Sequence, residues 1–174
     1  MLIYTGIGHR DTPEHILALF REVGAFLASK NCVLRSGGAQ GADSAFEEGC
    51  DQRNGAKEIY LPYKGFRGNK SELYGIADDE AALTLAAKYH QRWSSLSQKA
   101  KLLIGRNVYQ VLGKDLKTVS DFIICYSVKP SGTNMTLRVA ADYNVSIYNL
   151  GDNETWPVEK HNEIFDVLEE KYRF

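Results

Sequence analysis

The sequence predicts an α/β fold in which a doubly wound, mostly parallel five-stranded sheet carries helices on both faces. Short apolar runs of strand length alternate with stretches whose apolar residues recur at helical spacing. The first of these runs ends at Gly6 and the third at Pro62, as expected where strands end in turns. The chain has 174 residues, of which 44% are hydrophobic and 25% charged, so we expect a single domain with a full core over residues 1–174.

The first strand and the first helix are expected within the first thirty residues. Leu2–Thr5 is a buried-strand run that ends at Gly6. The segment Thr12–Glu14 predicts a helix start, with Thr12 as the cap, Pro13 in the first turn and Glu14 near the positive end of the helix dipole. Apolar residues then recur on one face of this helix, at Ile16, Phe20, Val23 and Leu27.

The remaining elements alternate in the same way, and right-handed crossovers between them predict a Rossmann-like sheet. In chain order we expect a strand at Cys32–Leu34, a helix from Gly41 to about Arg53, a strand at Glu58–Leu61 stopped by Pro62, a strand at Phe122–Tyr126, a helix over about Thr133–Tyr143, a strand at Val145–Tyr148 and a last helix that opens at Pro157.

Residues 63–118 are too many for one crossover, so we expect a helical insert between the third and fourth strands. A loop over Tyr63–Ile76 should lead to a helix beginning near Asp78–Glu80, followed by a second helix from about Ser95 to Val111. The insert has ten Lys/Arg and five Asp/Glu, hence a charge of +5, whereas the rest of the chain carries −6. The insert could serve as a lid, an interface or a nucleic-acid patch, and the sequence leaves these three open.

Charge and cysteine content exclude several classes of protein. A net charge of −1 gives no global attraction to nucleic acid, and no apolar run approaches membrane-spanning length. The three cysteines are odd in number and have no metal-ligand spacing, which favours a reduced, cytoplasmic setting. We therefore expect no metal site, no cofactor and no membrane partner.

Three loops that follow strands are rich in Gly, Ser, Thr and basic residues. They follow the first, second and fourth strands, whose carboxyl ends should meet where the strand order reverses, the usual ligand site of such a sheet. Glycines let the backbone approach an anion, and free N–H groups at helix starts point toward it. We expect a composite phosphate-binding site made of Gly6, Gly8, His9, Arg10, Ser36, Gly37, Gly38, Gln40, Gly41, Asp43, Ser127, Ser131, Gly132, Thr133 and Asn134.

Four side chains have expected roles beyond backbone contacts. Arg10 and Arg106 would add charge-assisted contacts to phosphates. Asp43 or Asn107 would form hydrogen bonds with the sugar or the base of a nucleotide. Simpler explanations stay open. Asp43 in the first turn of a helix complements the helix dipole, and Arg106 and Asn107 could lie on a solvated helix face.

The order Gly6-x-Gly8-His9-Arg10, then Ser36–Asp43, then Ser131–Thr133, resembles the SLOG superfamily. That superfamily includes the DprA/Smf DNA-processing proteins, the LOG phosphoribohydrolases and small nucleotide-binding proteins, often from phages. The segment Gly105–Gly113 is similar to the arginine-asparagine segment of DprA. The resemblance implies a nucleotide-type ligand (NAD-like, ADP-ribose-like or a mononucleotide) and a homo-oligomer.

One departure from the LOG enzymes bears on catalysis. Leu137 stands where those enzymes carry a catalytic glutamate, and an aliphatic side chain cannot transfer protons. Glu47 or Glu48 could substitute from the second helix. We therefore rank a nucleotide sensor or sequestering protein first, an N-glycosidic-bond hydrolase or transferase second, and a DprA-like factor that binds single-stranded DNA third.

Overall fold

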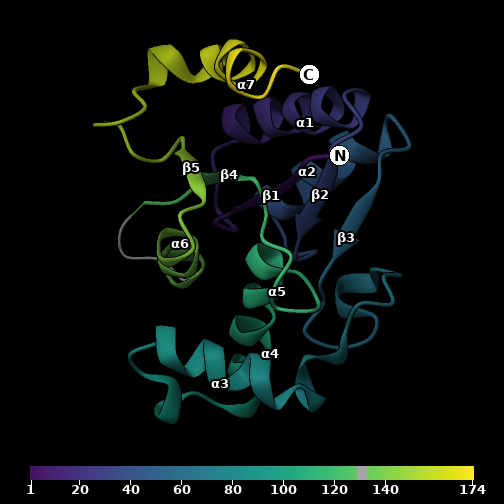
Figure 1. Ribbon diagram of the computed structural model, residues 1–174, viewed down its shortest axis with the longest axis vertical. Coiled ribbons are helices and arrows are strands. Elements are labelled where there is room, and N and C mark those ends of the chain that lie inside the picture. The colour runs from purple at the N-terminus through teal and green to yellow at the C-terminus, as the bar shows by residue number, and fades with distance from the viewer. Residues whose placement is uncertain (129–132) are drawn as a thin grey trace.

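A computed structural model describes residues 1–128 and 133–174 of the chain (Figure 1). Its five strands form one sheet in the order β3-β2-β1-β4-β5, and all four pairings are parallel. The doubly wound α/β class predicted from the sequence is confirmed. β1 and β4 lie side by side at the point where the strand order reverses. The strands are β1 (Ile3–Gly8), β2 (Val33–Ser36), β3 (Lys57–Ile59), β4 (Phe122–Tyr126) and β5 (Ser146–Asn149).

Helices cover both faces of the sheet, as Figure 1 shows. One buried apolar cluster joins the sheet to α1 (Glu14–Ser29), α2 (Ala42–Asp51) and α7 (Ile164–Tyr172). A second cluster joins the opposite face to α3 (Glu80–Tyr89), α5 (Asn107–Leu112) and α6 (Thr133–Asp142). Neighbouring strand residues alternate between the clusters, because successive side chains of a strand point to opposite faces; Phe122 and Ile124 join the first, Ile123 and Cys125 the second.

The first cluster brings α2 very close to β1. Phe46 of α2 stacks on Phe20 of α1 with ring centroids 4.2 Å apart. A Cβ atom at Gly6 would lie 2.6 Å from the Phe46 ring, so only glycine fits there. Gly6, expected in the ligand site, thus has a packing role that sets α2 against the sheet.

The insert differs from the sequence prediction in one respect. The prediction of a single helix over about Ser95–Val111 was wrong, because the chain forms two helices there. These are α4 (Gln98–Gly105) and α5, which meet at Arg106. The physical reason is that α5 is buried against the sheet, whereas most of α4 remains partly exposed. A straight helix could not pack α5 on the sheet and still direct α4 away from it.

The expected loop over residues 63–76 contains two short 3₁₀ turns, η1 (Phe66–Gly68) and η2 (Gly75–Asp78), and a third, η3 (Trp93–Ser95), follows α3. The last helix begins at Ile164 rather than near Pro157, because η4 (Val158–Glu163) precedes it. Other element ends differ from the predicted ones by a few residues.

The predicted capping role of Thr12 was wrong. Pro13 occupies the N-cap position of α1, and no side chain caps this helix end. The Thr12 hydroxyl instead donates a hydrogen bond to the carbonyl of His9, at 2.7 Å. Thr12 therefore fixes the loop that leaves β1, which carries the first group of candidate ligand residues.

Asp79 joins two helices of the insert, α3 and α5. Its carboxylate accepts a hydrogen bond from the Ala82 N–H at the start of α3 and another from the Tyr109 hydroxyl on α5. Replacing Asp79 with Ala should lower the free energy of unfolding by about 1–2 kcal/mol, because a helix cap and a tertiary contact are lost together. Urea denaturation checks this. Asp78→Ala, at the exposed neighbour, should change that free energy by less than about 0.5 kcal/mol, and equal losses in the two variants would contradict the role given to Asp79.

No helix within residues 1–128 or 133–174 has both the length and the apolar character that crossing a bilayer requires.

Candidate functional site

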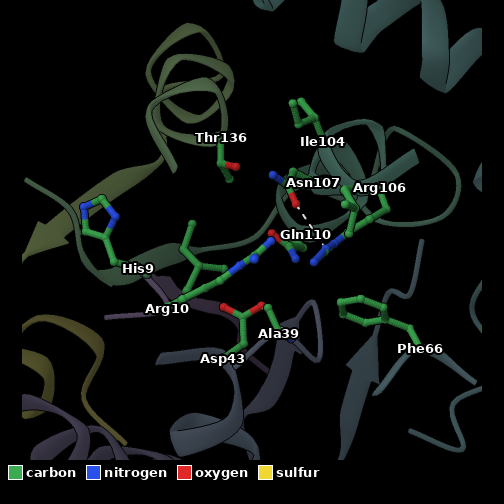
Figure 2. Close-up of a pocket in the computed structure, with 13 residues that line it drawn as sticks. His9, Arg10, Ala39, Asp43, Phe66, Ile104, Arg106, Asn107, Gln110 and Thr136 are labelled. Carbon is green, nitrogen blue, oxygen red and sulfur yellow. Dashed lines mark hydrogen bonds between the residues drawn. The ribbon is translucent and has the colours of Figure 1, made fainter. Parts of the chain in front are cut away.

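A cavity of about 320 Å³ opens at the carboxyl ends of β1 and β2, beside the point where the strand order reverses. Figure 2 shows its lining side chains. They come from the end of β1, the loop and helix after β2, the insert, and α6. The lining residues are Ile7, Gly8, His9, Arg10, Ala39, Asp43, Phe66, Leu103, Ile104, Arg106, Asn107, Gln110 and Thr136.

Two glycines let separate segments approach one another beneath this cavity. Gly41 has φ +87°, and a Cβ atom there would lie 2.5 Å from the Arg10 carbonyl oxygen and 2.6 Å from that of His9. A Cβ atom at Gly37 would lie 2.7 Å from the guanidinium carbon of Arg106. The loop after β2 is thus in van der Waals contact with the loop after β1 on one side and with the insert on the other.

Arg106 is a buried cation with few partners. Its side chain is 4% exposed, yet within the described residues it enters no ion pair and forms one hydrogen bond, from Nη1 to Asn107 Oδ1 at 3.4 Å. Its Nε atom has no hydrogen-bond partner in the part of the chain that the structure describes. Burial lowers the pKa of Arg106 below its ordinary value; Asp43 opposes this shift, and Arg10 adds to it.

Arg35 shows what a fully paired buried arginine looks like in the same protein. It is 2% exposed, and its Nε donates to the Glu58 carboxylate at 2.7 Å, while Nη1 donates to the Thr118 carbonyl at 2.5 Å. Buried charges normally have such partners, because desolvation is costly. Arg106 lacks them and lines a cavity, which is the arrangement expected of an arginine that receives an anion.

Arg10 and Arg106 enter the cavity from opposite sides, with the carboxylate of Asp43 below them and Asn107 above (Figure 2). Arg10 is exposed, whereas Arg106 packs its guanidinium 5.8 Å from the centre of the Phe66 ring. Two cations and one carboxylate therefore share the cavity. This excess of positive charge favours an anionic group.

Asp43 is 4% exposed, and its carboxylate accepts a hydrogen bond of 3.3 Å from the Ala39 N–H. Burial raises the pKa of Asp43 to about 6, against the opposing effects of Arg106 and of the Ala39 and Gly37 N–H groups. Asp43 contributes the only carboxylate among the cavity-lining residues named above. It can accept a hydrogen bond from a ligand when ionised and donate one when protonated.

His9 joins the loops that follow β1 and β4. Its Nε2 accepts a hydrogen bond of 2.8 Å from the Val128 N–H, and its ring contacts Tyr126 edge-on. These contacts connect the two strands on either side of the reversal point. His9 thus lines the cavity and also positions Val128, the second residue after β4.

The structure brings together part of the predicted set at this cavity: Gly8, His9, Arg10, Asp43, Arg106 and Asn107 line it, and Gly37 and Gly41 lie beneath it. Ser36 instead donates to the Gly6 carbonyl, Gln40 is exposed, and Gly38 faces Leu61 and Asn69. Ser127 donates to Asn134 at 3.3 Å, and neither residue lines the cavity. Ser131 and Gly132 lie outside the described residues, as does the side chain of Thr133.

The carboxylates expected on α2 face elsewhere. Glu47 pairs with Lys57 at 2.9 Å and accepts from Asn69, and Glu48 pairs with Arg21 at 2.6 Å. On α6, the residue that lines the cavity is Thr136 rather than Leu137, which packs against the second apolar cluster. Asp43 therefore takes the place beside the cavity in which we expected a glutamate of α2.

Several lining residues were not predicted, namely Ile7, Ala39, Phe66, Leu103, Ile104, Gln110 and Thr136. The Gln110 amide lies against Gly37 beside Arg106. It belongs to the Gly105–Gly113 segment already singled out in the sequence, one helical turn after Arg106, and that spacing could have revealed it. Phe66 had no comparable signal, because a loop brings it to the cavity.

Among the side chains of the described residues, no group of three or more His, Cys, Asp or Glu is arranged to hold a metal ion. The two guanidinium groups that line the cavity cannot act as metal ligands, because they have hydrogen-bond donors and no acceptor.

The chain matches no protein-family model, and no curated protein sequence is similar to it at a significant level. Solved structures do share its fold. The molybdenum cofactor carrier protein from Chlamydomonas reinhardtii superposes with a TM-score of 0.56 and 16% identity over 96% of this chain and 86% of that one.

DNA processing protein A from Helicobacter pylori, described for its single-stranded DNA binding mode, gives a TM-score of 0.55 and 16% identity over 85% of this chain and 64% of its own. DprA from Streptococcus pneumoniae gives a TM-score of 0.51 and 14% identity over 85% of this chain and 49% of its own. The chain thus spans less than two thirds of either DNA processing protein. At these identities the similarity concerns the fold alone.

Proposed function

We propose that this protein binds a nucleotide or nucleotide-derived small molecule in the cavity at the carboxyl edge of its sheet, as a sensor or a sequestering protein. The observation that carries the proposal is the buried, underpartnered guanidinium of Arg106 beside Arg10. An anion between these two arginines would supply the acceptors that Arg106 lacks. Phosphate fits, because guanidinium groups bind its oxygens with paired N–H donors.

The rest of the cavity suits the remainder of a nucleotide. Phe66, Leu103 and Ile104 form an apolar wall against which a planar base would pack. Asn107 and Asp43 offer a polar edge for sugar hydroxyls or base nitrogens. The cavity volume, about 320 Å³, is at the small end of the range for ligand sites, which favours one nucleotide unit over a dinucleotide.

The glycine motifs and the fold shared with DprA and the molybdenum cofactor carrier support a place among SLOG-type proteins. A cytoplasmic homo-oligomer is part of the same proposal. Hydrolysis of an N-glycosidic bond ranks lower, because Glu47 and Glu48 are engaged in ion pairs away from the cavity.

Binding of single-stranded DNA is the second candidate. It is favoured by the fold shared with a DNA processing protein studied for that activity and by the +5 charge of residues 63–118. Such binding depends on neutralising many phosphates and falls steeply with salt. A single enclosed guanidinium instead suits a small anion.

A ligand panel tests the proposal. Calorimetry and thermal unfolding should be measured with nucleoside monophosphates, ADP-ribose, NAD and an oligothymidine. We expect at least one small ligand to bind and to raise the Tm, because a ligand present at a hundred times its Kd stabilises the folded state by about 2.7 kcal/mol. Oligothymidine binding that weakens strongly between 50 and 200 mM salt, with no small ligand bound, would favour the second candidate. No effect from any phosphate-bearing ligand would overturn the first.

A further inference from the structure

Asp43 lines the same cavity as the proposed anion site. Its side chain is 4% exposed and faces the cavity in which the two arginines converge (Figure 2). Although Arg106 influences it electrostatically, no ion pair joins Asp43 to any of the described residues. The ionised carboxylate is therefore held by long-range attraction and by N–H groups of the Gly37–Ala39 loop.

An anion that binds between Arg10 and Arg106 would change this balance in two ways. It would neutralise the cations that favour the ionised form of Asp43, and it would add a negative charge close to the carboxylate. Both changes favour the protonated acid. A protonated Asp43 could also donate a hydrogen bond to an oxygen atom of the ligand.

We propose that Asp43 takes up a proton when an anionic ligand enters the cavity, so that the protein holds its ligand more tightly in mildly acidic than in alkaline solution. This inference rests on the function proposed above and adds to it a proton linkage at the same site. Burial already raises the pKa of this carboxyl to about 6, so a modest further change is enough to shift its protonation.

The other ionisable groups around Asp43 are few. Arg106 and Arg10 face it from the insert and from the loop after β1, and Glu47 lies one turn further along α2, where it raises the pKa of Asp43. His9 is the remaining ionisable group of the cavity, and its Nε2 already accepts the Val128 N–H. The Asp43 variant below separates the contribution of Asp43 from that of the rest of the cavity.

The test uses sulfate, whose charge stays at −2 from pH 5 to pH 8, together with ADP-ribose, whose diphosphate also keeps its charge over this range. The apparent Kd is measured at pH 5.5, 6, 7 and 8 from calorimetry or from Tm shifts at constant ionic strength. Above pH 6 the wild-type Kd should rise with pH, because only the protein with a protonated Asp43 binds well. The steepest rise expected from one group is about tenfold per pH unit. We expect at least about a tenfold rise between pH 6 and pH 8.

Asp43→Asn mimics the protonated acid and should bind both probes with a Kd that changes less than about threefold over this range. Glu48→Gln is the matched control. It removes one charge from the same helix at an exposed position that pairs with Arg21, and it should keep the wild-type pH dependence. A pH dependence that persists in Asp43→Asn would assign the effect to another group and overturn the proposal.

A second measurement needs no variant. Calorimetry of the wild-type protein with ADP-ribose at pH 7.2, in Bis-Tris and in Tris, reports protons exchanged on binding from the difference in apparent enthalpy. Uptake close to one proton is expected, and equal enthalpies in the two buffers would overturn the linkage. Binding that is tight but independent of pH removes this inference alone, whereas absence of binding at every pH by these two probes and by every small ligand of the panel removes the proposed function as well.

Discussion

Replacing Arg106 with methionine is expected to weaken ligand binding about thirtyfold or more, while the free energy of unfolding of the ligand-free protein stays within about 1 kcal/mol of wild type. The two effects separate because Arg106 is buried with little compensation: its Nε has no partner, and its one hydrogen bond is long. Methionine would fill similar volume beside Phe66 without the cost of desolvating a charge.

The loss of binding follows from the charge-assisted hydrogen bonds that Arg106 would make to the anion. Each such bond is worth about 1.5–3 kcal/mol, and 2 kcal/mol corresponds to about thirtyfold in Kd. Calorimetry with the ligand found in the panel measures the affinity, and urea denaturation measures stability. Arg92→Met is the control, since Arg92 is exposed in the same insert and its replacement makes the same change in net charge.

Wild-type affinity in Arg106→Met would show that the cavity beside Arg106 is not the ligand site. A large loss of stability together with lost binding would instead indicate that the insert needs the cation–π contact with Phe66 to fold.

Gly41→Ala is expected to lower the free energy of unfolding by about 3 kcal/mol or more. Gly41 adopts φ +87° and ψ −123°, which side chains other than glycine strongly disfavour. Its Cβ atom would also meet the backbone carbonyls of His9 and Arg10, at 2.6 and 2.5 Å. Because those atoms belong to the backbone, no rotamer change can relieve the clash.

Gly65→Ala is the reference for a glycine with positive φ and no clash. Gly65 has φ +72°, but a Cβ atom there meets nothing within 4 Å, so its variant measures the cost of left-handed backbone with no clash. That cost is about 1–2 kcal/mol. Urea denaturation of both variants gives the comparison. Equal losses in Gly41→Ala and Gly65→Ala would mean that the loops after β1 and β2 do not meet as closely as the structure has them.

Most of the fold could be predicted from the sequence because the relevant signals are local. Runs such as Phe122–Tyr126 and the helical stripe of α1 depend on the alternation of neighbouring side chains with period 2 or 3.6. The break at Arg106 had no such signal. Its residue types suit a helix, and packing of α5 on the sheet decides where the helix ends.

The residues of the candidate site also fall into those that local sequence could predict and those that it could not. His9 and Arg10 directly follow β1, and Asp43 lies in the first turn of the helix after β2, so the order of the elements was enough to expect them together. Which α6 residue faces the cavity depends on the rotation of that helix, and the structure has Thr136 there rather than Leu137. Phe66, contributed by the loop of residues 63–76, depends entirely on long-range packing.

The sequence by itself determined that a doubly wound parallel sheet forms and that glycine-rich, polar loops follow its first, second and fourth strands. Only the tertiary structure decided that the insert closes over the end of β2, where Arg106 is buried without an adequate partner and Asp43 is buried beside it. The physical reason is that strand and helix formation depend on neighbours in the chain. The burial of a charge, and hence its pKa and its need for a partner, depends on atoms about sixty residues away.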